Sequence, residues 1–141
     1  MGSMSNYLES GIIQHFLRTG SISKPSTLAV ALCSGLLDDT NTGANLPEMA
    51  NTGGYARVDL TAPSNSIWDY QGLTGATQNT SQISFPAATA DWGVASGIAI
   101  VDNATYGAGN VLLWGYLTRK RDVLDGDTFS FGAGNIDFTL D

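Results

Sequence analysis

The sequence predicts a mainly β domain, an antiparallel, jelly-roll-like β-sandwich of about seven to eight strands with one N-terminal α-helix. Its 141 residues fit a single domain with one core. Charged residues make up 13% of the chain and there are 17 glycines, a composition typical of short strands joined by tight turns. We expect residues 4–141 to form this domain. Residues 1–3, which precede a second methionine at Met4, are expected to be an expression scar outside the fold.

One helix is expected at residues 6–19. Asn6 and Glu9 have the spacing of a capping box, and Gly20 supplies a stop. Apolar side chains between these signals recur at helical spacing. They are Leu8, Ile12, Ile13, Phe16 and Leu17.

Three strands are expected in the first two thirds of the chain. Residues 27–34 are apolar on both faces, which indicates an interior strand. Residues 55–61 alternate between polar and apolar side chains, the pattern of a half-buried strand. Residues 81–86 place two apolar side chains on one face before Pro86 ends regular pairing.

Two hairpins are expected in the last third. Residues 95–102 and 110–118 are the strongest strand candidates, and residues 127–131 and 135–140 form a second alternating pair. The sequence Gly-Ala-Gly-Asn occurs between the strands of both pairs. Each copy precedes a strand and lacks the lysine of a phosphate-binding loop, so we interpret both as turns.

Two long polar stretches, residues 35–54 and 62–80, are candidate contact loops. Compact domains rarely contain such long connections without a function for them. Trp68 and Tyr70 lie in the second stretch and are the candidate aromatic anchors for subunit or partner contacts.

The stretch "ISFPAATADWG" (83–93) ends in Asp91-Trp92, which we interpret as a corner of the fold. Asp91 is expected to turn the chain so that Trp92 packs over the end of the sandwich. The alternative is a sugar-binding site built from the aromatic residues Trp68, Tyr70 and Trp92.

The charge of the chain limits the classes of molecule that it is expected to bind. The net charge of −7 argues against binding to nucleic acid, which relies on clustered cations. Half of the six basic residues nevertheless lie together at Arg119, Lys120 and Arg121, which could meet an acidic neighbour. No apolar run approaches the roughly 18 residues of a membrane span, and no cleavable leader is recognisable, so membrane insertion is not expected.

The residues that usually perform catalysis are scarce. His15 is the single histidine and Cys33 the single cysteine, which is too few for a histidine-based triad or a zinc site. We therefore expect no enzymatic activity and no cofactor, with Cys33 as a small core residue. Weak candidates for a calcium site are Asp122, Asp125 and Asp127.

The order of the motifs is similar to that of a family of small tailed-bacteriophage virion proteins usually labelled tail fibre protein. The resemblance covers nearly all of residues 4–141. The motifs are, in order, "YLESGIIQHF", "TLAVALCSG", "GGYARVDL", "ISFPAATADWG", "GIAIVDNA", "LLWGYLT" and "DGDTFSFGAGNIDFTLD". The basic segment 119–121 departs from the pattern, which has a neutral segment there.

The resemblance implies a non-enzymatic structural protein of the virion, made in the bacterial host cytoplasm. We expect a tail fibre or tail-associated surface component that binds other virion proteins. It would assemble through its polar loops, and also its helix, into a homo-oligomer for which a trimer is favoured. Two alternatives remain open. One is a capsid decoration protein that uses residues 119–121, and the other is a module that binds host-surface glycans.

Overall fold

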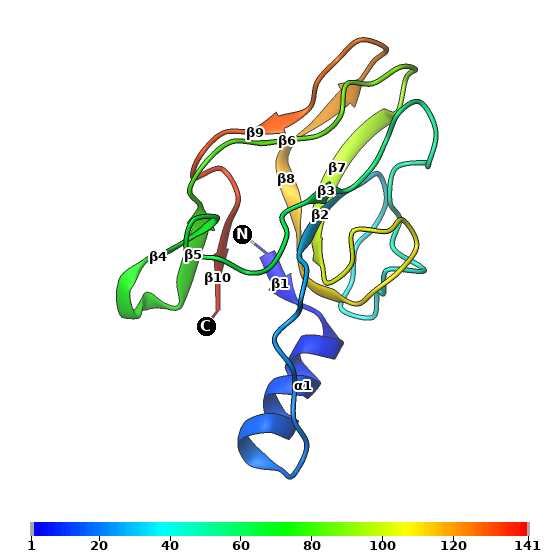
Figure 1. Ribbon diagram of the computed structural model, residues 1–141. Helices are drawn as coiled ribbons and strands as arrows, with labels where there is room; N and C mark the ends of the chain where they lie inside the picture. Colours follow the sequence, from blue (N-terminus) through cyan, green and yellow to red (C-terminus); the bar gives the residue numbers. More distant parts are fainter. Residues whose placement is uncertain (1, 141) are drawn as a thin grey trace.

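The computed structural model describes residues 2–140 and is mainly β, with antiparallel sheets and one long helix (Figure 1). The main sheet has the spatial order β1 (Gly2–Met4), β8 (Val111–Val123), β7 (Gly93–Val101), β2 (Ala29–Cys33) and β3 (Val58–Asp59). A second sheet contains β10 (Asp137–Thr139), β5 (Ala76–Asn79) and β4 (Trp68–Tyr70), and a third contains β6 (Ile83–Ser84) and β9 (Ser130–Phe131). The predicted fold class, mainly β and antiparallel with an N-terminal helix, is confirmed.

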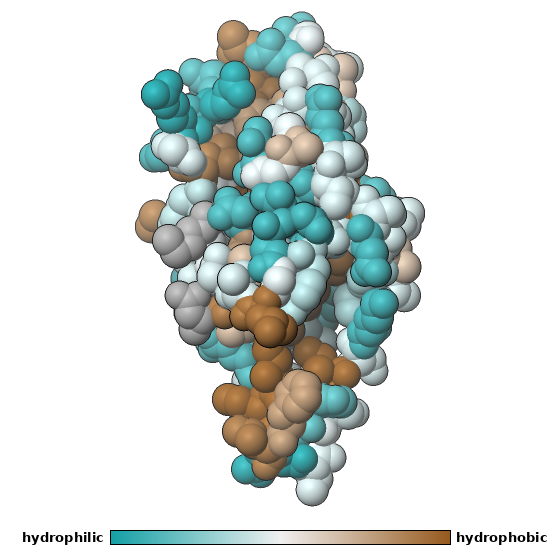
Figure 2. Space-filling view, turned by 90° about the vertical axis from the view of Figure 1, so that its left-hand side faces the viewer, coloured by the Kyte–Doolittle hydropathy of each residue, from teal (hydrophilic) through white to brown (hydrophobic). Residues whose placement is uncertain are grey.

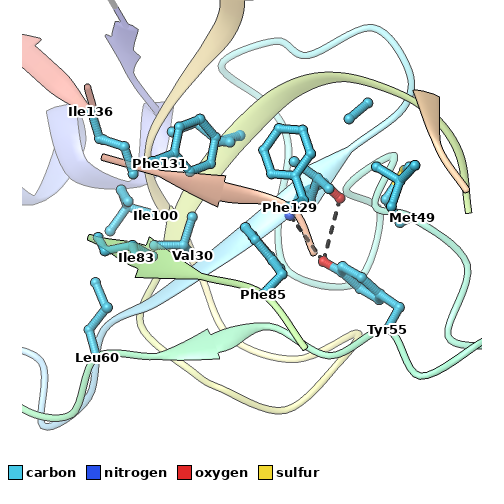
Figure 3. Close-up of a cluster of buried hydrophobic side chains, with 14 of the residues drawn as sticks. Val30, Met49, Tyr55, Leu60, Ile83, Phe85, Ile100, Phe129, Phe131 and Ile136 are labelled. Carbon is cyan, nitrogen blue, oxygen red and sulfur yellow. Dashed lines mark hydrogen bonds between the residues drawn. The ribbon is translucent and has the colours of Figure 1, made fainter. Parts of the chain in front are cut away.

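The main core lies between the main sheet and the two smaller sheets. Figure 3 shows Val30 and Ile100 of the main sheet beside Ile83 of β6, Phe131 of β9 and Phe129, which directly precedes β9. All five are less than a tenth exposed. Burying such side chains contributes roughly 1.5–3 kcal/mol each, which makes this interface the main source of stability.

The opposite face of the main sheet is covered by residues 35–49, part of the predicted contact loop 35–54. Leu37 and Leu46 of this segment are buried against Cys33 in β2. Because both faces are covered, every residue of β2 is buried, which confirms the predicted interior strand. The structure therefore gives much of this polar loop a core-covering role.

One predicted hairpin is confirmed and the other is wrong. β7 and β8 pair in antiparallel fashion, as expected for residues 95–102 and 110–118. The expected hairpin of 127–131 with 135–140 does not form, because β9 pairs with β6 and β10 pairs with β5. The partner of Ser130 is Ser84 and the partner of Asp137 is Gln78, so both strands pair with residues that lie far earlier in the chain, which a local sequence pattern cannot indicate.

The polar stretch 62–80 is also more ordered than a loop. It contains β4, the 3-10 helix η1 (Gly72–Thr74) and β5, and β5 is the central strand of the second sheet. Its pairing with β10 explains why a sequence without apolar alternation still forms a strand.

The helix α1 (Asn6–Leu17) projects from the sheets, as Figure 1 shows. Its N-cap is Ser5, not the predicted Asn6, because the Ser5 side chain accepts a hydrogen bond from the Leu8 N–H at 3.3 Å. It ends at Leu17, two residues before the predicted boundary at 19.

The placement of residues 1–3 outside the fold needs correction for the two that the structure describes. Gly2 and Ser3 belong to β1 and pair with Gly115 and Trp114 of β8. A Cβ atom at Gly2 would collide with the Trp114 carbonyl oxygen and the Phe138 ring, so the close approach of these strands depends on glycine. Residue 1 lies outside the described residues.

Candidate interaction surfaces

The outer face of α1 carries a cluster of exposed apolar side chains. Ile13, Phe16 and Leu17 are 50%, 74% and 80% exposed, and their spacing places them on one face of the helix. We call these three residues the α1 patch. In Figure 2, apolar surface gathers over the part of the molecule that α1 occupies. Soluble proteins seldom expose contiguous apolar side chains unless the surface binds something.

The inner face of the same helix holds it to the body. Leu8 and Ile12 are half-buried, and Gly11 packs so closely on Ile22 that a Cβ at position 11 would collide with the Ile22 side chain. The apolar stripe predicted from the sequence therefore has two parts. Leu8 and Ile12 anchor α1 to the body, and the α1 patch faces outward.

Trp68 and Tyr70, the predicted aromatic anchors, lie on β4 in different environments. Trp68 is half-buried and packs on Phe138, with ring centroids 6.4 Å apart. Tyr70 is 69% exposed, close in the chain to Leu73 at 98%. Tyr70 is thus accessible to a partner, whereas Trp68 contributes to the core.

The Asp91-Trp92 corner is confirmed. Trp92 donates from its indole Nε1 to the Gly53 carbonyl oxygen at 2.7 Å and packs edge-on against Tyr55. Asp91 accepts a hydrogen bond from the Asp125 N–H at 2.8 Å, which joins the corner to a second turn. Both side chains are therefore engaged within the fold.

The basic segment Arg119, Lys120 and Arg121 lies on β8, and all three side chains are exposed. It lines a cleft of about 690 Å³ between β8 and the segment that carries β9 and β10. The sequence predicted the cluster but gave no sign that it borders a cleft.

The weak calcium candidates do not converge. The Asp127 carboxylate accepts a hydrogen bond from the Leu124 N–H at 2.9 Å and so stabilises the turn. Asp122 and Asp125 do not join Asp127 in a metal-binding set, because residues 2–140 contain no group of three His, Cys, Asp or Glu side chains able to hold a metal ion. Asp127 stabilises a turn, and Asp122 lies in β8 opposite Val94.

His15 and Cys33 lie far apart in the fold. His15 is exposed on α1, where its ring packs edge-on against Phe16 with centroids 4.9 Å apart. Cys33 is fully buried in β2, and burial, together with the nearby Glu48 carboxylate, raises the pKa of its thiol. Cys33 is thus the core residue that the sequence predicted.

A buried ionic network was not predicted from the sequence. Arg57, expected on the polar face of a half-buried strand, is 5% exposed and forms a bidentate pair with Glu48, with both N···O distances 2.9 Å. The remaining guanidinium donors bind the carbonyl oxygens of Gly43, Asn103 and Ala108. Tyr55 donates its hydroxyl to the same Glu48 carboxylate at 2.7 Å. The network ties two loops to the main sheet, the one that contains Gly43 and the β7–β8 loop that contains Asn103 and Ala108.

No helix in the described range 2–140 is long and apolar enough to cross a membrane. No curated protein matches the chain. A family model described as podophage GP4 fiber I protein gp80 matches residues 3–139, which is nearly the whole chain. The chain therefore belongs to this family of phage fibre proteins, and the protein is a structural component of a bacteriophage virion.

Proposed function

We propose that this virion protein is a tail fibre component that assembles into a homo-oligomer, with a trimer favoured, through the α1 patch. The observation that carries the proposal is the outward-facing apolar edge of a helix that projects from the body. Three apolar side chains at positions i, i+3 and i+4 form the kind of seam through which helices associate.

The energy of such an association can be estimated from exposure. Full burial of one such side chain contributes roughly 2 kcal/mol, so covering the exposed parts of Ile13, Phe16 and Leu17 would contribute about 4 kcal/mol per chain. Three chains together would gain about 12 kcal/mol, which is comparable to the cost of immobilising them. Additional contacts from the body are therefore expected to contribute.

Tyr70 is the proposed additional contact. It lies on the exposed edge of β4 beside η1, away from the core, and it can bind another virion protein. Of the three aromatics that suggested glycan binding, Trp68 and Trp92 are half-buried and pack against Phe138 and Tyr55. We therefore favour assembly over glycan binding as the function of these surfaces. Decoration of the capsid remains the second candidate, supported by the exposed basic segment 119–121.

Sedimentation equilibrium of wild-type and Phe16→Glu proteins tests the proposal. We expect the wild type to sediment at three times the 14.8 kDa chain mass. The charged side chain at Phe16 should shift the protein to monomer, because the α1 patch would then have to bury a carboxylate. Gln82→Glu is the matched control, since Gln82 is exposed and lies outside α1.

The outcomes are distinct. A wild type that remains monomeric across the concentration range would refute the assembly proposal. An oligomer that survives Phe16→Glu would show that assembly uses a different surface. Far-ultraviolet circular dichroism would verify that both variants remain folded.

A further inference from the structure

The cleft beside β8 has the features of a second binding site, independent of α1. Its floor consists of core side chains, among them Phe129, Phe131 and Ile136, which Figure 3 shows pointing inward from the covering segment. Its volume of about 690 Å³ falls in the range of clefts that hold ligands. The rim on the β8 side carries the basic segment 119–121.

The charge of this rim is not neutralised within the fold. Among residues 2–140 the single ion pair joins Arg57 to Glu48, so Arg119, Lys120 and Arg121 all lack a carboxylate partner there. Asp137 is the one acidic side chain that lines the cleft. The guanidinium of Arg121 lies 6.0 Å from the centre of the Phe129 ring. The cleft is thus locally cationic on a protein whose net charge is −7.

The backbone of β8 is also unpartnered along this cleft. On its outer side β8 pairs with β1 at residues 113–115. On its inner side it pairs with β7 at Tyr116 and again at Arg121, which leaves residues 117–120 bulged out of the ladder opposite Ser96. No described strand pairs with the outer edge of residues 116–122.

An exposed strand edge is a template for another strand, and proteins usually cover it or protect it with charge. Cations on this edge would repel a second copy of the same edge. They would favour an extended segment that carries carboxylates. Backbone hydrogen bonds supply affinity in such strand addition, and side-chain pairs supply selectivity.

We propose that this cleft binds an extended acidic segment of another virion protein, which adds as a strand to the free edge of β8. The carboxylates of that segment would pair with Arg119, Lys120 and Arg121. The proposal does not depend on the α1 patch, because the two surfaces lie on different elements.

The test is a nuclear magnetic resonance titration of the full-length, nitrogen-15-labelled protein with a synthetic octapeptide of alternating glutamate and valine. We expect the largest amide shifts at residues 116–122, and slower hydrogen exchange there. Added salt should weaken binding, since exposed charge pairs are screened. The same peptide with lysine in place of glutamate should not bind.

Two further reagents separate strand addition from simple charge attraction. An octapeptide N-methylated at every residue keeps its carboxylates but cannot donate a backbone hydrogen bond along either edge, so it should not bind. The triple variant R119Q/K120Q/R121Q should bind the parent peptide about tenfold more weakly or worse, as expected for three exposed charge pairs. The matched control R18Q/K24Q removes two cations elsewhere on the surface and should bind normally.

Several results would overturn the proposal. They are the absence of shifts at millimolar peptide, equal binding of the N-methylated peptide, or equal binding to the triple variant. Binding of polygalacturonate in the cleft without binding of the peptide would overturn it in favour of an acidic polysaccharide. Because the three basic side chains are exposed, the triple variant should fold, and its amide spectrum verifies this directly.

Discussion

Replacing Arg57 by methionine should unfold this domain at a markedly lower temperature. The guanidinium binds both oxygens of Glu48 and donates to carbonyl oxygens in the loops at Gly43, Asn103 and Ala108. Methionine fills a similar volume but donates no hydrogen bond. The carboxylate of Glu48, 2% exposed, would keep the Tyr55 hydroxyl as a donor and lose its countercharge.

The magnitude follows from the cost of an unpaired buried charge. Removing one member of a buried ion pair typically costs about 3–5 kcal/mol. For a domain of this size 1 kcal/mol corresponds to roughly 3 °C in the melting temperature, so Arg57→Met should lower it by about 10–15 °C. Loss of donors to three loop carbonyls would add to this cost.

Urea denaturation and differential scanning calorimetry measure the effect. Lys24→Met is the matched control, because Lys24 is exposed and should change the free energy of unfolding by less than about 0.5 kcal/mol. The double variant E48Q/R57M should be more stable than Arg57→Met alone, since it removes the unpaired charge as well.

A loss of less than about 1 kcal/mol in Arg57→Met would refute this reasoning. It would mean that the Glu48 carboxylate reaches water at little cost. A double variant no more stable than Arg57→Met would likewise show that the unpaired carboxylate is not the source of the instability.

Three further predictions concern the interior. Asn79→Ala should cost roughly 2–4 kcal/mol in urea denaturation, because the Asn79 amide donates to the Gly132 carbonyl oxygen and accepts from the Ile136 N–H; a loss below 1 kcal/mol would contradict this role. Burial raises the pKa of both Cys33 and Tyr55 above their ordinary values of 9.0 and 10.0. The folded state then holds protons that the unfolded state releases, so the free energy of unfolding should fall by about 1.4 kcal/mol per pH unit above 9.0 and more steeply above 10.0; flat stability up to pH 11, on the order of two units above the Cys33 value, would contradict it. Native Cys33 should resist Ellman's reagent at pH near 8 and react once urea unfolds the chain, whereas rapid native labelling would show that β2 opens readily.

Local pattern in the sequence was sufficient for the elements whose neighbours lie nearby. The doubly apolar run of β2, the β7–β8 hairpin and the apolar spacing of α1 all appear where the sequence predicted them. Side-chain period and turn residues act over a few positions, so each of these signals is complete within its own segment. The ordered motifs likewise pointed to the phage fibre family.

Tertiary structure decided everything that depends on distant partners. β9 and β10 look like a hairpin in sequence, but each pairs with a strand that lies far earlier in the chain. From its position in an alternating segment, Arg57 is expected at the surface. In the fold it is bound by Glu48 and by three loop carbonyl oxygens. The burial of Arg57 depends on which distant segments pack together, and the sequence of its own segment does not indicate this.

The candidate sites were likewise predicted only in part from the sequence. The sequence located the basic segment 119–121 and the apolar stripe of α1. The fold alone determines that the basic segment borders a cleft along an unpaired edge of β8, and that Phe16 and Leu17 face outward while Leu8 faces the body. Residue type sets the chemistry of a surface, and packing decides whether that surface remains free to bind a partner.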